Sequence, residues 1–252
     1  MLTDTHAHLD YFENPEQIIK EAKEKNVNKI IIPGVEPCGF DKIKEIAKNN
    51  EGIYSAFGVH PSDIEKFGDD AANKMIEYLK DEKAIAVGEI GLDYYYEENL
   101  DKEKQKKGFI QQLEIAKALN KPVLIHAREA YLDTFEILKQ SGVEKVIMHC
   151  FSGSLEYAKQ CIKEGWYIAI GGVVTFKNAK KLKEVVYDIP LNKLMLETDC
   201  PYLAPHPFRG QENSPKYIPL IAKEIANIKD IIYDEVVEAT EQNVKDFFGI
   251  EV

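Results

Sequence analysis

Histidines and acidic residues are the side chains in this sequence whose types and spacing could bind metal. His6 and His8 are separated by one residue, and on a strand this spacing points both imidazoles to the same face, where they can share one ion. Glu89 lies among apolar residues and glycines in segment 88–93. Because an unpaired carboxylate in such surroundings is costly or takes up a proton, Glu89 needs a cationic partner. The sequence therefore predicts a metal ion beside these three residues.

Three further candidate ligands come at the ends of later apolar runs. A single histidine is more often a hydrogen-bonded, semi-buried side chain than a ligand, but a set of this size is poorly explained in that way. The predicted metal ligands are His6, His8, Glu89, His126, His149 and Asp199. They are more than one tetrahedral ion with an open position can use. We therefore expect two divalent metal ions bridged by a carboxylate, which is a standard arrangement for hydrolysing phosphate esters.

The elements that must position these residues alternate between short apolar runs and longer amphipathic stretches. The runs predict eight strands, at residues 2–8, 29–35, 53–60, 85–92, 123–126, 146–151, 167–174 and 194–199. The amphipathic stretches predict helices at residues 15–25, 41–49, 69–80, 101–119, 130–140, 155–164, 179–186, 217–227 and 234–247. Residues 201–215, rich in proline and glycine, are expected to form a loop after the eighth strand.

Eight strand–helix units in 252 residues favour an α/β fold of the (β/α)8 TIM-barrel type, formed by a single domain over residues 1–252. An open doubly wound sheet is the second choice, since it usually has fewer strands. In a barrel the active site lies at the C-terminal ends of the strands. Five of the six histidines fall at or next to such an end, and His206 lies in the following loop. The barrel therefore predicts that the candidate ligands meet at one site.

Composition and charge restrict the function classes. With 44% hydrophobic residues the chain is expected to be globular rather than disordered. The 32 basic and 43 acidic residues give a net charge of −11, which argues against a broad groove for duplex nucleic acid but leaves room for a local phosphate site. We expect a cytoplasmic protein, because no apolar run approaches the roughly 18–20 residues of a membrane span and the N-terminus does not resemble a secretory signal.

Five motifs resemble the TatD family of metal-dependent deoxyribonucleases, which belongs to the amidohydrolase-like barrels. The motifs are Asp4-Thr5-His6-Ala7-His8-Leu9-Asp10, Gly88-Glu89-Ile90-Gly91-Leu92-Asp93-Tyr94, His126-Ala127-Arg128, His149-Cys150-Phe151-Ser152-Gly153 and Glu197-Thr198-Asp199-Cys200-Pro201-Tyr202-Leu203. Each is short, but their order and their positions on successive predicted strands make the resemblance specific over nearly the whole chain. The resemblance implies cleavage of phosphodiester bonds in DNA, often by 3′→5′ exonuclease activity.

The resemblance also implies roles for the candidate ligands. It assigns His6, His8 and Asp199 to one metal ion, His126 and His149 to the second, and Glu89 to both as the bridging carboxylate. The implied chemistry is attack on phosphorus by a metal-activated hydroxide, with Asp199 taking up the water proton and acting with Glu89 as a catalytic residue. Imidazole-rich ligation suits zinc, manganese or iron better than magnesium, although magnesium can serve with carboxylates and phosphate, so the metal identity stays open.

Substrate-binding candidates come from the scarcity of arginine. Only two of the 32 basic residues are arginines, Arg128 and Arg209, and each lies in a loop after a predicted strand. A planar guanidinium suits bidentate phosphate binding, although pairing with Glu129 or Glu212 would explain either residue without a substrate. His60 is a third candidate, as a donor to a phosphate oxygen or as a hydrogen-bonded structural histidine.

Other features set the expected substrate and its alternatives. The family often carries basic residues after the Arg-Gly pair, whereas Gln211-Glu212-Asn213 follows here, which favours single-stranded DNA or strand ends over long duplexes. Tyr94-Tyr95-Tyr96 fits base stacking or a packed loop equally well. The lysines at 177, 180, 181 and 183 are expected to form a solvated helix face.

Two alternative functions stay open. The predicted metal site could instead hydrolyse an ester or amide, such as an aminoacyl-RNA or a small metabolite. A non-catalytic, metal-stabilised barrel that binds nucleic acid or protein is the third reading.

Overall fold

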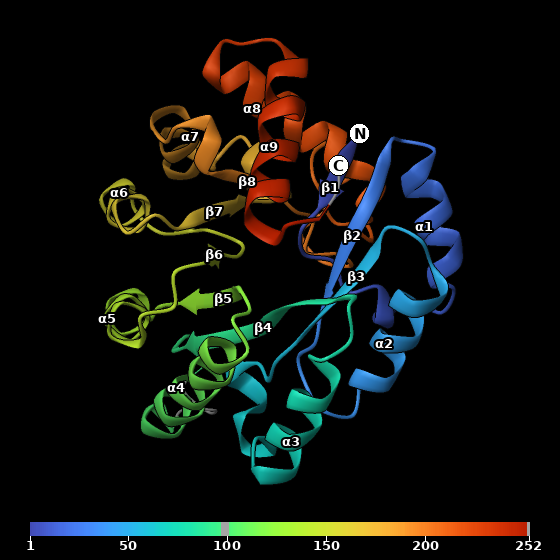
Figure 1. Cartoon of the computed structure of the whole chain (residues 1–252). Coiled ribbons are helices and arrows are strands. Elements are labelled where there is room, and N and C mark those ends of the chain that lie inside the picture. Colours follow the sequence, from blue (N-terminus) through green and yellow to red (C-terminus); the bar gives the residue numbers. More distant parts are fainter. Residues whose placement is uncertain (97–100, 251–252) are drawn as a thin grey trace.

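The computed structural model describes residues 1–96 and 101–250, and within them eight parallel strands form one sheet (Figure 1). The strands neighbour one another in sequence order: β1 (Leu2–Asp4), β2 (Val27–Pro33), β3 (Ile53–Phe57), β4 (Ala84–Asp93), β5 (Val123–Arg128), β6 (Val146–Met148), β7 (Tyr167–Ile170) and β8 (Leu194–Leu196). The predicted (β/α)8 barrel is confirmed, and the open doubly wound sheet is excluded by this strand order.

Helices surround the strands, as Figure 1 shows. Seven of them follow β1 to β7: α1 (Pro15–Lys23), α2 (Phe40–Asn49), α3 (Asp69–Tyr78), α4 (Lys102–Ala118), α5 (Tyr131–Ser141), α6 (Leu155–Lys163) and α7 (Lys180–Asp188). Two more, α8 (Ile218–Lys229) and α9 (Tyr233–Phe248), follow β8. Asn14, Asp101 and Ser154 cap α1, α4 and α6, each accepting a hydrogen bond from the backbone N–H three residues later. These caps explain why the helix starts are readable from the sequence.

Backbone contacts between the chain after β8 and the chain after β1 close the barrel. The N–H of Thr5 donates to the carbonyl of Leu196 at 2.9 Å, and Ala7 forms a parallel bridge with Cys200. Small and branched side chains fill the interior, namely Ile31, Ala56, Ala86, Leu124, Ile147, Ala169 and Met195. A larger apolar cluster lies between the strands and the helices. Closure places the ends of β1 and β8, which are far apart in the sequence, side by side.

Helix α9 covers the N-terminal end of the barrel. Val244 and Phe247 pack against the interior cluster. The side-chain amide of Asn243 donates to the carbonyls of Leu191 and Leu194, where β8 begins. Since α9 closes this end, the opposite end, where the strands finish, is left for a site. Within residues 1–96 and 101–250, none of the helices combines the length and hydropathy needed to cross a membrane.

Several predicted strands are longer than the observed ones at their C-terminal ends. The prediction extended the first, sixth and eighth strands to residues 8, 151 and 199, whereas β1, β6 and β8 end at Asp4, Met148 and Leu196. The backbone leaves the extended conformation soon after two of these ends, because Cys150 and Asp199 have positive φ angles of 42° and 57°. Apolar patterning does not reveal such a change, since the residues beyond the strand remain buried.

Candidate metal centre

The six predicted metal ligands converge at the C-terminal end of the barrel. They come from the chain after β1 (His6, His8), from β4 (Glu89), from β5 (His126), and from the residues after β6 (His149) and β8 (Asp199). Their nitrogen and oxygen atoms form several overlapping groups in which all atoms lie within 4.8 Å of one another. Residues separated by almost 200 positions in the sequence are thus brought together by closure of the barrel.

His6 and His8 face the site although they lie beyond the regular part of β1. The N–H of Asp199 donates to the His6 carbonyl and the N–H of His8 donates to the Cys200 carbonyl, each at 2.9 Å. Ala7, between the two histidines, is completely buried on the other side. The alternation that was expected of a strand therefore persists in an extended segment that pairs with the chain after β8.

The carboxylate of Glu89 lies at the centre of the cluster, and its two oxygens face two different pairs of imidazoles. Oε2 lies 3.2 Å from His6 Nε2 and 4.0 Å from His8 Nε2. Oε1 lies 2.8 Å from His126 Nδ1 and 3.6 Å from His149 Nε2. Only 3% of Glu89 is exposed. This is the arrangement expected of a carboxylate shared by two cations.

Asp199 lies beside the first pair of imidazoles and reaches towards the second. Its Oδ1 is 3.5 Å from His8 Nε2 and 3.8 Å from His149 Nε2. The carboxylate also lines a cavity of about 1030 Å³ at the mouth of the barrel, together with Glu89 and four of the histidines. A substrate in this cavity would therefore be in contact with the centre of the cluster.

Burial and charge act together on the titration of this cluster. Burial by itself would raise the pKa of the Glu89 carboxyl, but the facing His149 and His6 hold that pKa well below its usual range. Burial likewise opposes ionisation of His149, yet Glu197 and Glu89 outweigh it and raise the pKa of His149 to about 10. Buried carboxylates are thus balanced by imidazolium protons. A divalent cation supplies the same positive charge and would displace these protons.

Several buried nitrogens in the cluster have no hydrogen-bond partner among the described residues. Both nitrogens of His6 and Nδ1 of His8 are in this position, and His6 Nε2 forms no hydrogen bond even though Glu89 is near. A buried polar atom without a partner is costly, so its persistence needs an explanation. Of these three atoms, His6 Nε2 is the one that faces Glu89, and an imidazole nitrogen aimed at a shared carboxylate is the chemistry of a zinc or manganese site. The residues present therefore fit a divalent metal centre.

Two further carboxylates orient imidazoles of the cluster. Asp93 Oδ2 lies 2.9 Å from His126 Nε2, which leaves Nδ1 of that ring facing Glu89. Glu197 Oε2 lies 2.9 Å from His149 Nδ1, which leaves Nε2 of that ring facing Glu89. Carboxylates commonly fix the ring nitrogen that a metal-binding histidine presents. Sequence reasoning missed both roles, although each residue belongs to a motif that also carries a predicted ligand.

The glycines of the β4 motif are required by close contact between strands. Gly91 has a φ of +146°, and a Cβ atom at this position would lie 2.0 Å from the carbonyl oxygen of His126. At Gly88 a Cβ atom would lie 2.7 Å from the Cβ of Leu124. No side chain fits in either place, so glycine allows β4 and β5 to approach with Glu89 and His126 at hydrogen-bond distance.

His60 lies at the edge of the cluster and is held in one tautomer. The backbone N–H of Ser62 donates to His60 Nδ1 at 3.1 Å, so the proton of the neutral ring is on Nε2. That atom lies 3.7 Å from Glu89 Oε1. Burial and the neighbouring His126 lower the pKa of His60 to about 3. The ring is therefore a neutral donor that faces the cavity.

The two arginines have different surroundings. Arg128 ends β5 and lines the cavity, with its guanidinium 3.7 Å from the ring centre of Tyr95. Arg209 lies 4.5 Å from the ring centre of Phe176 and is not among the described residues that line the cavity. Of the two predicted phosphate-binding arginines, the structure brings only Arg128 to the candidate site.

Some side chains of the Tyr94-Tyr95-Tyr96 segment and of the lysine group at 177–183 line the cavity, and others form contacts elsewhere. The hydroxyl of Tyr94 donates to Asp133 at 2.8 Å, whereas Tyr96 lines the cavity. Lys183 pairs with Glu224 at 2.6 Å, as expected of a helix face. Lys180 and Lys181 instead line the cavity, which the solvated-face interpretation did not anticipate. The helix pattern alone could not show that α7 begins at the mouth of the barrel.

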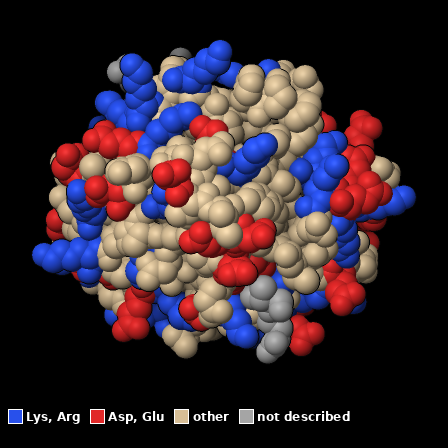
Figure 2. Space-filling model, turned by 90° about the horizontal axis from the view of Figure 1, so that it is seen from above, with Lys and Arg blue, Asp and Glu red and all other residues tan. Residues whose placement is uncertain are grey.

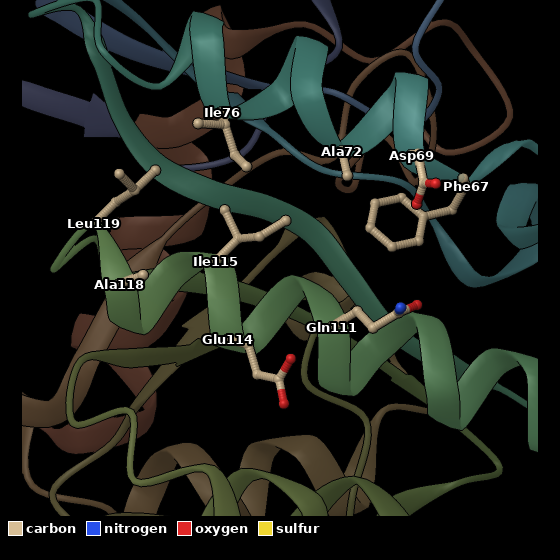
Figure 3. Close-up of a pocket in the computed structure, with 10 residues that line it drawn as sticks. Phe67, Asp69, Ala72, Ile76, Gln111, Glu114, Ile115, Ala118 and Leu119 are labelled. Atoms are coloured by element: carbon tan, nitrogen blue, oxygen red, sulfur yellow. The ribbon is translucent and has the colours of Figure 1, made fainter.

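A second cavity, of about 490 Å³, lies on the outside of the barrel between α3 and α4 (Figure 3). Ala72 and Ile76 line it from α3, and Gln111, Glu114 and Ile115 line it from α4. Its lining is mostly apolar and includes none of the candidate metal ligands. The chemistry of the molecule is therefore concentrated in the cavity at the barrel mouth.

Comparisons with known proteins agree with this fold. The family model described as TatD related DNase matches residues 3–249. The uncharacterized metal-dependent hydrolase YabD of Bacillus subtilis is 42% identical over 99% of this chain and all of that protein. The crystal structure of YjjV, a TatD homologue from Escherichia coli, superimposes with a TM-score of 0.95 at 31% identity, covering 99% of this chain and 98% of that one. The chain therefore belongs to the TatD-related DNase family of metal-dependent hydrolases.

Proposed function

We propose that this protein hydrolyses phosphodiester bonds of DNA at a centre that holds two divalent metal ions. The observation that carries this proposal is the position of Glu89, whose two oxygens face separate pairs of imidazoles. A structural site for one ion would be closed and would not need a second set of ligands. The family supports the hydrolase class, and the name of the matching model supports DNA as the substrate.

The described residues supply a ligand set for each ion. His6, His8 and Asp199 would hold one ion, His126 and His149 would hold the other, and Glu89 would contact both. When bound, divalent ions in such a site activate water and neutralise charge that develops on phosphate oxygens. Imidazole-rich ligation favours zinc or manganese, and the carboxylates allow magnesium as well.

Asp199 and two side chains outside the ligand set would act directly on water or on the substrate. The Asp199 carboxylate faces the cavity, and the neighbouring His8 and His149 help to hold its pKa below the usual value against the effect of burial, so it is ionised and can accept a proton. The Nε2–H of His60 can donate to a phosphate oxygen. Arg128, whose guanidinium lies over the ring of Tyr95, can form an ion pair with a second phosphate oxygen.

The charge distribution favours a short, locally bound substrate. Arg128, Lys180 and Lys181 place positive charge around the cavity. Outside the cavity, basic and acidic side chains are interspersed on the face that Figure 2 shows, and neither sign covers it. Long duplexes need an extended basic surface, whereas a strand end needs only a local site. We therefore propose single-stranded DNA or strand ends as the substrate. The 3′→5′ direction of degradation is proposed from the resemblance to the family alone.

The test combines metal analysis with nuclease assays on wild-type protein and on Glu89→Gln. We expect two ions per wild-type chain, and a loss of DNA hydrolysis by more than about 100-fold in Glu89→Gln, because this variant loses a ligand shared by both ions. Glu114→Gln, which alters the outer cavity, is the matched control and should keep full activity. Oligonucleotides labelled at either end give the direction. Cleavage of aminoacyl esters but not of DNA by the metal-loaded wild type would overturn the proposal.

A further inference from the structure

We propose that Tyr11 and Tyr202 form a subsite for one nucleobase of the substrate, an inference that rests on the proposed hydrolysis of DNA. Tyr11 comes from the loop after β1 and Tyr202 from the loop after β8, and both line the cavity that contains the metal centre. Their exposed fractions are 47% and 55%. Two large aromatic rings are thus left open to water beside the candidate active site.

Exposed apolar and aromatic side chains are concentrated at this mouth. The described residues include ten large ones, and half of them lie in or beside the cavity: Tyr11, Tyr95, Tyr96, Tyr202 and Leu203. Exposed rings scattered over a surface need no explanation, but a cluster around a cavity marks a binding site. The rings of Tyr95 and Tyr96 already have an occupant, since the Arg128 guanidinium lies over them. Tyr11 and Tyr202 form the aromatic wall that is open to a ligand.

The geometry of this wall suits one planar ring. Tyr11 stacks on His8, with ring centres 5.2 Å apart and planes at 14°, so His8, a candidate metal ligand, covers one face of Tyr11. Tyr202 stands nearly perpendicular to Tyr11, at 81° with ring centres 6.4 Å apart. The two rings therefore make a corner. A planar group stacked on either ring of this pair would be nearly perpendicular to the other ring, which is a favourable edge-to-face arrangement.

The corner is also at the right place for a nucleotide. Tyr11 contacts His8, and His8 Nε2 lies 3.5 Å from Asp199 Oδ1 at the metal centre. A base in the corner would thus belong to a nucleoside joined to the phosphate under attack. Each base has a π-face, so stacking binds all four bases and needs no sequence-specific hydrogen bonds. This explains how a protein with a net charge of −11 can hold a nucleic-acid end without a long basic groove.

The experiment compares three oligothymidylates. One is complete, and each of the other two has an abasic residue next to the scissile phosphate, one on its 5′ side and one on its 3′ side. For the wild type we expect kcat/KM to fall at least about fivefold when the base is missing on one side, which is the lower end of the effect of base stacking. Tyr202→Leu should lose this difference, whereas Tyr202→Phe, which keeps the ring, should retain it.

Controls separate the subsite from the proposed function. Tyr187→Leu removes an exposed tyrosine of α7 that does not line the cavity, and it should retain the wild-type base preference. Metal content should be the same in every variant. If the wild type cleaves complete and abasic oligomers equally, or if Tyr202→Leu keeps the preference, the subsite is refuted while DNA hydrolysis stands. If the wild type cleaves none of the three oligomers, the proposed function itself fails.

Discussion

Asp93 Oδ2 lies 2.9 Å from His126 Nε2, and this contact determines which nitrogen of His126 faces Glu89. The position of Asp93 is itself fixed by Gln105 of α4, whose side-chain amide accepts a hydrogen bond from the Asp93 N–H at 2.9 Å and donates to the Asp93 carbonyl at 3.0 Å. Gln112, about two turns further along the same face of α4, forms the same pair of hydrogen bonds with the backbone of Val59, which precedes His60. One outer helix thus fixes two segments of the barrel mouth.

Asp93→Asn should weaken metal binding without unfolding the protein. An asparagine can still approach His126, but it carries no charge and can present its NH2 group to the ring, so Nδ1 is no longer reliably free for the metal. We expect the affinity of one of the two metal sites to fall about 10- to 100-fold. Competition with a chelator measures this change. Asp41→Asn, in a surface ion pair with Lys74, is the control, and equal affinities in the two variants would contradict the role of Asp93.

Gly91→Ala should be strongly destabilising, because the added methyl group would lie 2.0 Å from the His126 carbonyl oxygen and the backbone φ is +146°. We expect the free energy of unfolding to fall by about 2–4 kcal/mol. Gly68→Ala is the matched control, since no heavy atom lies within 4 Å of the added methyl group, and it should cost no more than about 1 kcal/mol, the loss of a glycine at the N-cap of α3. Urea unfolding of both variants checks the difference, and similar midpoints would show that β4 and β5 can separate.

Arg128→Lys should impair substrate binding, because lysine lacks the planar fork that can bind two phosphate oxygens and stack on Tyr95. We expect kcat/KM on DNA to fall about tenfold, the size of one charge-assisted contact. Arg209→Lys makes the same chemical change away from the cavity and should leave kcat/KM unchanged. Steady-state kinetics on a short oligonucleotide compare the two, and a larger effect at Arg209 would reverse the assignment.

Glu241 gives a prediction for the dependence of stability on pH. This residue of α9 is buried, and burial raises its pKa even though Lys29 lies 3.8 Å away. An acid whose pKa is raised in the folded state contributes stability below its ordinary pKa and loses it as the pH rises through the folded value. As the pH rises above the ordinary glutamate pKa of about 4.3, Glu241→Gln should therefore become more stable relative to the wild type. Thermal unfolding of both proteins over a series of rising pH values tests this, and the opposite trend would refute it.

The barrel and the set of candidate ligands could be predicted from the sequence because both follow from local patterns. Each strand is a short apolar run, and His126 and His149 come directly at the end of such a run. Since parallel strands in a barrel finish at the same end, knowing the runs is enough to bring those side chains together. Capping residues such as Asn14 and Asp101 likewise mark helix starts by their own chemistry.

The roles that depend on contacts between loops could not be predicted. Glu197 precedes Asp199 by two residues, but only the structure shows that it contacts His149 rather than solvent. Lys180 and Lys181 have the pattern of a solvated helix face, and their place at the cavity depends on where α7 begins. Tyr202 belongs to the motif that begins at Glu197, but it lies in a loop whose path has no periodicity. In each case the decisive information is a distance between segments that are remote in sequence.

The central claim is that Glu89 joins two metal ions in one centre. Electron paramagnetic resonance of the manganese-loaded protein tests this directly, because two Mn2+ ions that share a carboxylate are magnetically coupled. We predict a coupled spectrum at two ions per wild-type chain, and only uncoupled Mn2+ in Glu89→Gln. A wild-type spectrum of isolated ions at every metal ratio, or coupling that survives in Glu89→Gln, would contradict the claim.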